Sequence, residues 1–398
     1  MREMKDTGVV WIGRIPSQWD ISTVNSLYTL RNQKVSDRDY PPLSVTMKGI
    51  VPQLNTAAKT DAHDDRKLVR KGDFAINSRS DRRGSCGISD YDGSVSLINI
   101  VLTPRGKMHP EYYNWLFHSS RFADEFYRWG HGIVDDLWTT RWQEMRNISI
   151  PVPEYAIQQR IADHLDHKCT QIDALIANAQ QQIEKLKAYK QSVITEAVTK
   201  GLDSDVPMKD SGNEYIGEIP DHWKTIKIKY LCTMQAGKNL ISEQISESGI
   251  YPVYGGNGIR GFFSEPNYKG ECLLIGRQGA LCGNVHHVSG EFWATEHAVI
   301  TEPTEAVSIR YLFYLLTGIN LNLYVSPTAA QPGLSVNTMQ NVIVCLSPRN
   351  EQQQIAEYLD KKCEQIERLI AIKQQKIYKT QQYKKSIIYE YVTGKKEV

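Results

Sequence analysis

The sequence predicts a mixed α/β (α+β) fold with two similar globular domains, joined and spaced by two long antiparallel coiled-coil helices. Two observations support this prediction. The chain repeats itself once along its length, and each copy ends in a long apolar stripe at helical spacing. We place the first globular domain at residues 1–153 and its helix at 154–201, and the second domain at 202–348 and its helix at 349–398. A chain of 398 residues is long enough for two domains, each with its own core.

The duplication is visible as four landmarks that recur in the same order. IGRIPSQW at 12–19 returns as IGEIPDHW at 216–223, KGDFAINSR at 71–79 as KGECLLIGR at 269–277, and MRNISI at 145–150 as MQNVIV at 339–344. The fourth landmark, 161–199, returns without a gap at 355–393 with about half of the positions identical, which similar composition alone does not produce. The offset between the copies shrinks along the chain, as expected if surface loops diverged while the scaffold did not.

Each final segment of a copy predicts one long helix, because apolar residues recur every third or fourth position with no Pro or Gly before Gly201 and Gly394. A helix of roughly 40 residues is about 60 Å long, and so narrow a stripe needs a partner. The simplest partner is the other copy, packed antiparallel by a pseudo-twofold relation. The alternative is two independent helices, each lying on its own domain. The residues that we expect at the helix interface are Ile161, Leu165, Cys169, Ile172, Ile355, Leu359, Cys363 and Ile366.

Composition excludes several classes of protein. The 47 Lys+Arg and 45 Asp+Glu residues give a net charge of only +2, so any nucleic-acid contact must rest on local basic loops or on a partner. The start has no apolar signal segment, and no apolar run approaches a membrane span, so we expect a soluble, cytoplasmic protein. Seven cysteines without a Cys-x-x-Cys pair predict reduced, mostly buried thiols and no metal site.

No catalytic motif is evident. Gly256, Gly258 and Gly261 formally fit a dinucleotide-binding fingerprint, but Phe262, Phe263 and then Pro266 follow where that fingerprint requires a helix. We therefore reject the match. There is no phosphate-binding Walker sequence and no Asn-Pro-Pro-Tyr motif of adenine methyltransferases, so we expect no catalytic residue.

Polar and basic loop residues remain as candidates for contacts to bases or phosphates. Arg can pair with guanine through two hydrogen bonds, and Asn or Gln with adenine. For each residue the alternative is a solvated side chain or a local ion pair. Arg79 and Arg277 align in the two copies, which favours a phosphate or structural role, because base readers should differ between copies. The candidates are Lys48, Arg79, Arg82, Arg83, Asn257, Arg260, Arg277, Gln278, His286 and His287.

The chain resembles the specificity subunits of type I restriction-modification systems over nearly its whole length. The resemblance rests on the Ile-Gly-x-Ile-Pro-x-x-Trp opening of each half, on QQRIA at 158–162 and QQQIA at 352–356, and on LIGRQGA at 274–280. It implies two target-recognition domains, each reading one half of a bipartite site in double-stranded DNA, with the helices as a spacer.

The resemblance also implies partners for this chain. Two methyltransferase subunits are expected to dock on the helices, supply S-adenosylmethionine and flip the target adenine, and ATP-dependent restriction subunits are expected to be able to join. The chain itself would then be non-catalytic and bind no cofactor. Two alternatives stay open: a non-DNA coiled-coil adaptor that assembles proteins, and an enzyme with duplicated substrate domains, which lacks any nucleophile, carboxylate pair or metal cluster at usable spacing.

Overall fold

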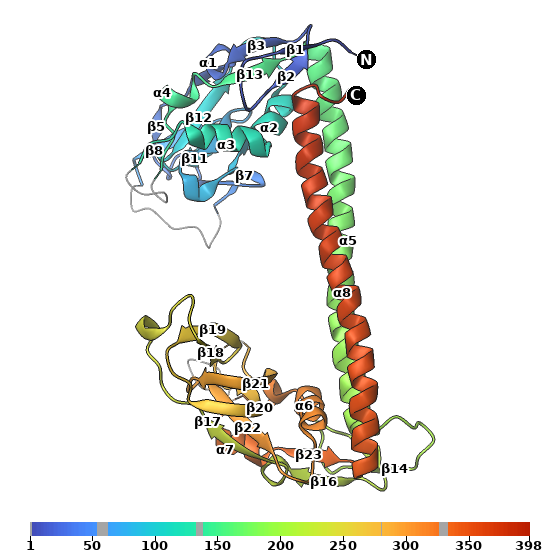
Figure 1. Ribbon diagram of the computed structural model, residues 1–398. Coiled ribbons are helices and arrows are strands. Elements are labelled where there is room, and N and C mark those ends of the chain that lie inside the picture. The colour runs from blue at the N-terminus through green and yellow to red at the C-terminus, as the bar shows by residue number, and fades with distance from the viewer. Residues whose placement is uncertain (1, 54–62, 133–137, 280, 326–332) are drawn as a thin grey trace. The chain divides into compact units, whose positions relative to one another are not determined.

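The computed structural model describes residues 2–53, 63–132, 138–279, 281–325 and 333–398. It divides into two compact units, one made of residues up to Ala179 together with Gln375–Val398, the other of Gln180–Gln374. Each unit therefore contains one globular part and a portion of both long helices, α5 (Tyr155–Lys200) and α8 (Arg349–Val392) (Figure 1). The predicted boundaries at 153, 201 and 348 remain a prediction.

The globular part of the first unit has an antiparallel sheet of order β10-β9-β12-β4 beside a sheet of order β11-β8-β5 and the pairs β6-β7, β13-β3 and β1-β2. Its elements are β1 (Met4–Asp6), β2 (Arg14–Pro16), β3 (Asp20–Thr23), α1 (Val24–Leu27), β4 (Tyr28–Leu30), β5 (Lys34–Val35), β6 (Leu43–Thr46), β7 (Gly49–Pro52), β8 (Arg66–Val69), β9 (Phe74–Asn77), η1 (Ser80–Arg82), β10 (Cys86–Ile88), β11 (Gly93–Val95), β12 (Asn99–Pro104), α2 (Pro110–His118), α3 (Ser120–Arg128), α4 (Trp142–Met145) and β13 (Ser149–Val152).

Strand β9 is the centre of this unit and is buried on both faces. Phe74 and Ile76 point into the main core, and Ala75 points into a smaller apolar cluster on the other face. The main core is aromatic: Phe117 of α2 packs on Phe74 with ring centroids 4.8 Å apart. Full burial explains the continuous apolar run of this strand.

The second unit is built around a six-stranded sheet of order β17-β22-β20-β21-β18-β19, with the pairs β16-β23 and β14-β15 beside it. Its elements are β14 (Met208–Asp210), β15 (Glu218–Pro220), β16 (Lys224–Lys227), η3 (Ile228–Tyr230), β17 (Cys232–Ala236), η4 (Ser242–Gln244), β18 (Tyr251–Gly255), β19 (Gly258–Phe263), β20 (Tyr268–Gly276), β21 (Val285–Ala294), β22 (Ala298–Pro303), α6 (Ile309–Gly318), η5 (Leu321–Tyr324), α7 (Val336–Asn341) and β23 (Ile343–Leu346).

Strand β20 has the same place in the second unit as β9 has in the first. Leu273 and Ile275 lie in the main core with α6, while Leu274 points to a separate cluster on the opposite face. Pairing with the neighbouring strand is equivalent too: Asn77 pairs with Asn99 in the first unit, and Gly276 with Ala298 in the second.

Helices α5 and α8 run antiparallel within each unit. In the first unit the start of α5 shares a core with the end of α8, through Leu165 and Val392 among others, and Lys384 pairs with Asp173 at 2.6 Å. These contacts exclude the alternative of two independent helices. Among the described residues, none of the helices combines the length and the apolar character needed to cross a membrane.

The second unit repeats this arrangement with the roles of the helices exchanged. The end of α5 packs with the start of α8, through Val198 and Leu359 among others, and Lys190 pairs with Glu367 at 2.5 Å. In the repeat, Glu367 is equivalent to Asp173 and Lys190 is equivalent to Lys384, in each case at an offset of 194 positions. The predicted fold class, with duplicated domains and antiparallel coiled-coil helices, is confirmed.

A glycine shortly after each long helix packs against the tryptophan of the opening motif. Gly201 and Gly394 have φ angles of +80° and +66°, the left-handed conformation that commonly closes a helix. A Cβ added to Gly201 would lie 3.3 Å from the ring of Trp223, and one on Gly394 would lie 2.8 Å from the ring of Trp19. In both units, the motif Ile-Gly-x-Ile-Pro-x-x-Trp thus packs against the end of a long helix.

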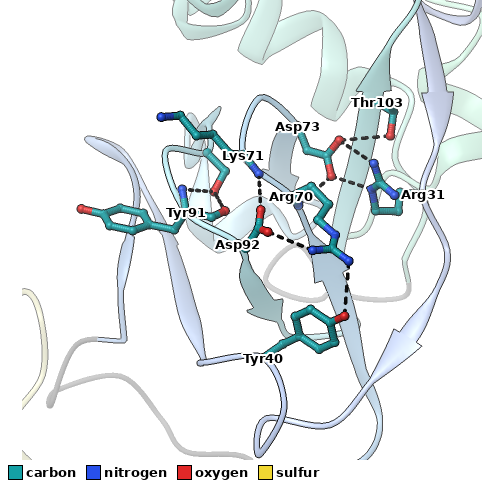
Figure 2. Close-up of polar contacts among 9 residues, drawn as sticks. Arg31, Tyr40, Arg70, Lys71, Asp73, Tyr91, Asp92 and Thr103 are labelled. Carbon is teal, nitrogen blue, oxygen red and sulfur yellow. Dashed lines mark hydrogen bonds and ion pairs between the residues drawn. The ribbon is translucent and has the colours of Figure 1, made fainter.

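A polar network fixes the start of β9 in the first unit (Figure 2). The buried carboxylate of Asp73 accepts hydrogen bonds from Arg31 at 2.5 and 3.1 Å, from the hydroxyl of Thr103 at 3.1 Å and from the backbone N–H of Arg70 at 2.9 Å. More exposed, Asp92 accepts from the Arg70 side chain at 2.9 Å. These bonds hold the strand that leads into the loop described below.

Replacing Asp73 by Ala is expected to destabilise the first unit by about 3 kcal/mol, because it leaves Arg31 and Thr103 without their acceptor in a mostly buried site. Thermal unfolding followed by calorimetry measures the loss. Asp92→Asn is the matched control and should change little, since the Asp92–Arg70 pair is exposed on both sides. Equal effects of both variants would contradict a structural role specific to Asp73.

Candidate nucleic-acid interface

The loop from Ser78 to Ser85 joins β9 to β10 and carries three of the predicted residues, Arg79, Arg82 and Arg83. Its two ends are tied together, because the N–H of Asn77 donates to the carbonyl of Ser85 at 2.9 Å. The N–H of Thr140 donates to Ser78 at 3.0 Å, and Arg79 forms an isolated bridge with Thr139. The loop therefore leaves the sheet on a fixed backbone.

The three arginines of this loop are not in the same situation. Arg82 lies 3.4 Å from Asp81, and Arg83 lies 3.3 Å from Asp124 with its guanidinium over the ring of Tyr127. Arg79 is exposed, and among the described residues its guanidinium has neither a hydrogen bond nor an ion pair. Arg79 is thus the free cation of the three within the described part of the chain.

Lys48 lies in the turn between β6 and β7, and this turn reaches the same edge of the domain. A Cβ added at Gly87 of β10 would lie 2.7 Å from the Cα of Gly49, next to Lys48. Lys48 and its neighbour Met47 are both exposed. The structure therefore brings the turn with Lys48 against the strand that follows the arginine loop.

In the second unit the loop from Arg277 to Asn284 joins β20 to β21 in the same way. The N–H of Gly276 donates to Asn284 at 3.0 Å, the N–H of Leu334 donates to Arg277 at 2.8 Å, and Gln278 forms a bridge with Gly333. Each contact has its counterpart in the first unit. The two loops share one backbone frame.

This frame corrects one expectation. Arg79 and Arg277 align in the sequence. In the structure, however, the carbonyl of Ser78 accepts from the N–H of Thr140, and the carbonyl of Arg277 accepts from the N–H of Leu334, so Arg277 is equivalent to Ser78. The structural counterpart of Arg79 is therefore Gln278, as the two bridges also indicate. The alignment is wrong by one residue, and so is the inference that equivalence gives Arg79 and Arg277 a shared role.

The β18–β19 turn packs against this second loop. A Cβ on Gly256 would lie 3.3 Å from the carbonyl of Gln278, and the side chain of Asn284 donates to that of Asn257 at 2.9 Å. Arg260 is exposed, with its alkyl chain against Gly255. The glycine-rich segment is a hairpin turn between two strands, so the rejection of a dinucleotide fingerprint is confirmed.

The two histidines of β21 lie on opposite faces of the sheet. His286 stands opposite Leu274 and approaches Gly258. His287 stands opposite Leu273, donates a hydrogen bond to the carboxylate of Glu271 at 2.8 Å and lies beside Phe313. Burial lowers the pKa of His286. The structure thus brings Asn257, Arg260, Gln278 and His286 together with Arg277 and leaves His287 apart.

All seven cysteines are free and buried, and burial raises the pKa of Cys232 to about 12. Across the described ranges, no three or more His, Cys, Asp or Glu side chains gather in a way that could hold a metal ion. Cys169 and Cys363 belong to the helix interface. The eight residues expected there are all buried: Ile161, Leu165, Cys169, Ile172, Ile355, Leu359, Cys363 and Ile366.

A feature that we did not predict from the sequence lies on the outer surface of the helices. Leu175 and Leu369 are 60% and 48% exposed, and Tyr189 and Tyr383 are 49% and 48% exposed. Each pair occupies equivalent positions of the repeat. The signal was present in the sequence, since identical apolar residues recur outside the buried stripe of both copies.

Comparison with known proteins agrees with this architecture. Residues 220–382 match the family model of the type I restriction modification DNA specificity domain. The chain is 24% identical to the MjaVIII specificity subunit of Methanocaldococcus jannaschii over 96% of this chain and 94% of that one. It is also 48% identical to the EcoprrI specificity subunit of Escherichia coli, over 32% of this chain and 33% of the relative.

Residues 220–382 thus match the specificity-domain family, and the chain is similar along its length to specificity subunits of type I restriction enzymes. A solved structure from work on the complex assembly and conformational transition of the type I R-M system has the same fold, with a TM-score of 0.71 at 14% identity. That likeness covers 95% of this chain and 98% of the other. In this chain, the loops after β9 and β20 have matching backbone hydrogen bonds in the two domains but carry different side chains.

Proposed function

We propose that this chain is a specificity subunit that directs a type I restriction-modification complex to a bipartite site in double-stranded DNA, with each recognition domain reading one half. The observation that carries the proposal is the pair of loops after β9 and β20. Their backbones are fixed by matching hydrogen bonds, yet their exposed side chains differ. A common frame with different polar side chains suits two readers of different sequences.

We also propose that the chemistry resides on partner subunits. Two methyltransferase subunits would dock on the helix pair and bind S-adenosylmethionine, and an ATP-dependent restriction subunit is a further expected partner. The specificity subunit would bind neither cofactor. A net charge of only +2 is compatible with partners that supply part of the phosphate contacts.

The exposed apolar residues of the helices support this docking. The Asp173–Lys384 pair sets the register in the first unit, so Leu175 and Tyr383 lie at nearly the same level of the helix pair. The Glu367–Lys190 pair places Leu369 and Tyr189 likewise in the second unit. Because apolar side chains that gather at one level of a surface mark interaction sites, two equivalent pairs of this kind fit two copies of one partner.

Glutamates in the first-unit patch, Leu175→Glu with Tyr383→Glu, are expected to remove one methyltransferase subunit from the complex while the second one stays. Burying two charges at an interface is costly, whereas the patch made of Leu369 and Tyr189 is untouched. Mass photometry measures the change from two partners to one. Ala174→Glu, exposed on the same turn but nearly without apolar area, serves as the control. Retention of two partners by the double variant would refute docking at this patch.

The proposed function is tested by co-expressing the chain with its methyltransferase subunit and mapping methylated adenines in genomic DNA by single-molecule sequencing. The full chain should methylate a two-part motif. Removing residues 205–345 should destroy the motif or make it symmetric. If no methylated motif depends on this chain, the proposal that it reads DNA is refuted. The favoured function is then that of a coiled-coil adaptor that assembles proteins without DNA.

A further inference from the structure

The correction of the alignment singles out one position in each recognition domain. Arg79 and Gln278 each follow the residue whose carbonyl is held by a backbone N–H, that of Thr140 or of Leu334. Each also forms an isolated antiparallel β-bridge to a later segment of its own domain, Arg79 to Thr139 and Gln278 to Gly333. The backbone at this position is therefore fixed in both domains, while the side chain differs.

Both side chains are exposed and available. Among the described residues, neither the guanidinium of Arg79 nor the amide of Gln278 has a hydrogen bond or ion pair, whereas Arg82 and Arg83 face carboxylates and Asn257 is bonded to Asn284. A side chain without a protein partner has no internal hydrogen bond to break when it pairs with a base. Its fixed backbone also lowers the ordering cost of binding.

The chemistry of the two side chains fits two different base pairs. A guanidinium pairs with O6 and N7 of guanine through two hydrogen bonds, and a glutamine amide pairs with N6 and N7 of adenine. Both residues lie in the loop between two antiparallel strands, β9–β10 or β20–β21, at the end of a sheet, so the exposed side chains project from a loop and not from the sheet itself.

We propose that Arg79 and Gln278 are equivalent base-reading residues, Arg79 selecting a G·C pair in one half-site and Gln278 selecting an A·T pair in the other. The inference rests on the proposed function and adds to it the residue that determines one base in each half. The exposed Arg82 and Arg83, which pair with Asp81 of the loop and Asp124 of α3, position the DNA through its phosphates instead.

Reciprocal substitutions in the complete complex with the methyltransferase test this assignment. Arg79→Gln should change the preferred base at one position of the first half-site and leave the second half-site as it was. Gln278→Arg should do the reverse. Binding to duplexes substituted at each position should show a loss of discrimination of about tenfold or more at that one position. Arg79→Lys, which retains the charge but not the two-bond geometry, should relax the same position.

The control is Arg82→Gln, the same substitution in the same loop, which should weaken binding evenly across sequences and lower its salt dependence. An even loss of affinity for Arg79→Gln, or an unchanged motif in an active complex, would overturn the inference. If Arg79→Gln does not fold, Arg79→Lys decides the first half-site and Gln278→Arg decides the second one independently. A wild-type complex without a two-part motif would instead refute the proposed function itself.

Discussion

Removing residues 388–398 is expected to unfold the first recognition domain, although most of that domain lies more than two hundred positions earlier in the sequence. Ile388 and Val392 are buried in its core. The hydroxyl of Tyr112 donates to the carbonyl of Val392 at 2.7 Å, and the ammonium of Lys395 donates to the carbonyl of Ile12 at 2.6 Å. The end of the chain is thus an internal part of the first unit.

The expected loss is large. Burial of the two apolar side chains contributes about 1.5–3 kcal/mol each, and each hydrogen bond contributes about 1 kcal/mol. A loss on the order of 6 kcal/mol is comparable with the whole stability of an ordinary domain, about 5–15 kcal/mol. Limited proteolysis with mass spectrometry should show new cleavage within residues 63–132, while the second unit stays resistant.

A shorter truncation provides the control. Removing only 396–398 deletes side chains that are mostly exposed and should leave the proteolysis pattern unchanged. If the longer truncation also leaves the first domain protected, the contacts of the chain end with that domain do not stabilise it. Loss of protection in both units together would show that the two units do not unfold separately.

Trp223→Ala is expected to destabilise the second unit by about 3–5 kcal/mol, because the indole is fully buried beneath the glycine that ends α5. Trp19→Ala should have an effect of the same size on the first unit, beneath Gly394. For a unit of this size the change corresponds to a fall in Tm of roughly 10 °C. Calorimetry should show one transition moving in each variant.

The phenylalanine variants separate packing from hydrogen bonding. The indole N–H of Trp223 donates to Glu351 at 2.9 Å, whereas that of Trp19 has no partner among the described residues. Trp223→Phe should therefore cost about 1 kcal/mol more than Trp19→Phe. Tyr230→Ala, at an exposed position of the second unit, is the control for a lost aromatic ring. Equal costs for the two phenylalanine variants would mean that the bond to Glu351 contributes nothing.

The duplication, the two long helices and their buried stripe could be predicted from the sequence, because a helix interface repeats at a short local period. Ile161 and Leu359, for example, are identified by their neighbours three and four positions away. The two opening motifs around Trp19 and Trp223 were also evident as a pair. Their packing against the end of a helix could not be predicted, because Gly394 is distant from Trp19 in the sequence and Gly201 belongs to the other copy of the repeat than Trp223.

Which residues of the loops after β9 and β20 are equivalent could not be predicted from the sequence. Strand β9 and the second half of β20, Cys272–Gly276, are buried on both faces, so their sequences show no alternation that would reveal which residue faces which core. Pairing with β12 and β22 decides the register, and a slip of one residue exchanges the faces. The same sensitivity separates His286 from His287. Arg79 and Gln278 could be recognised as counterparts only from the folded backbone.

The packing of Gly394 against Trp19 has a consequence for the order in which the two units fold during synthesis. A ribosome adds about 5–20 residues per second, so the strands and short helices of the first unit emerge on the order of 10–40 seconds before the segment that completes it. The second unit receives both of its helix portions, the end of α5 and the start of α8, without such a wait. The amino-terminal domain is therefore the last to close, because its core is complete only when the residues around Val392 have been added.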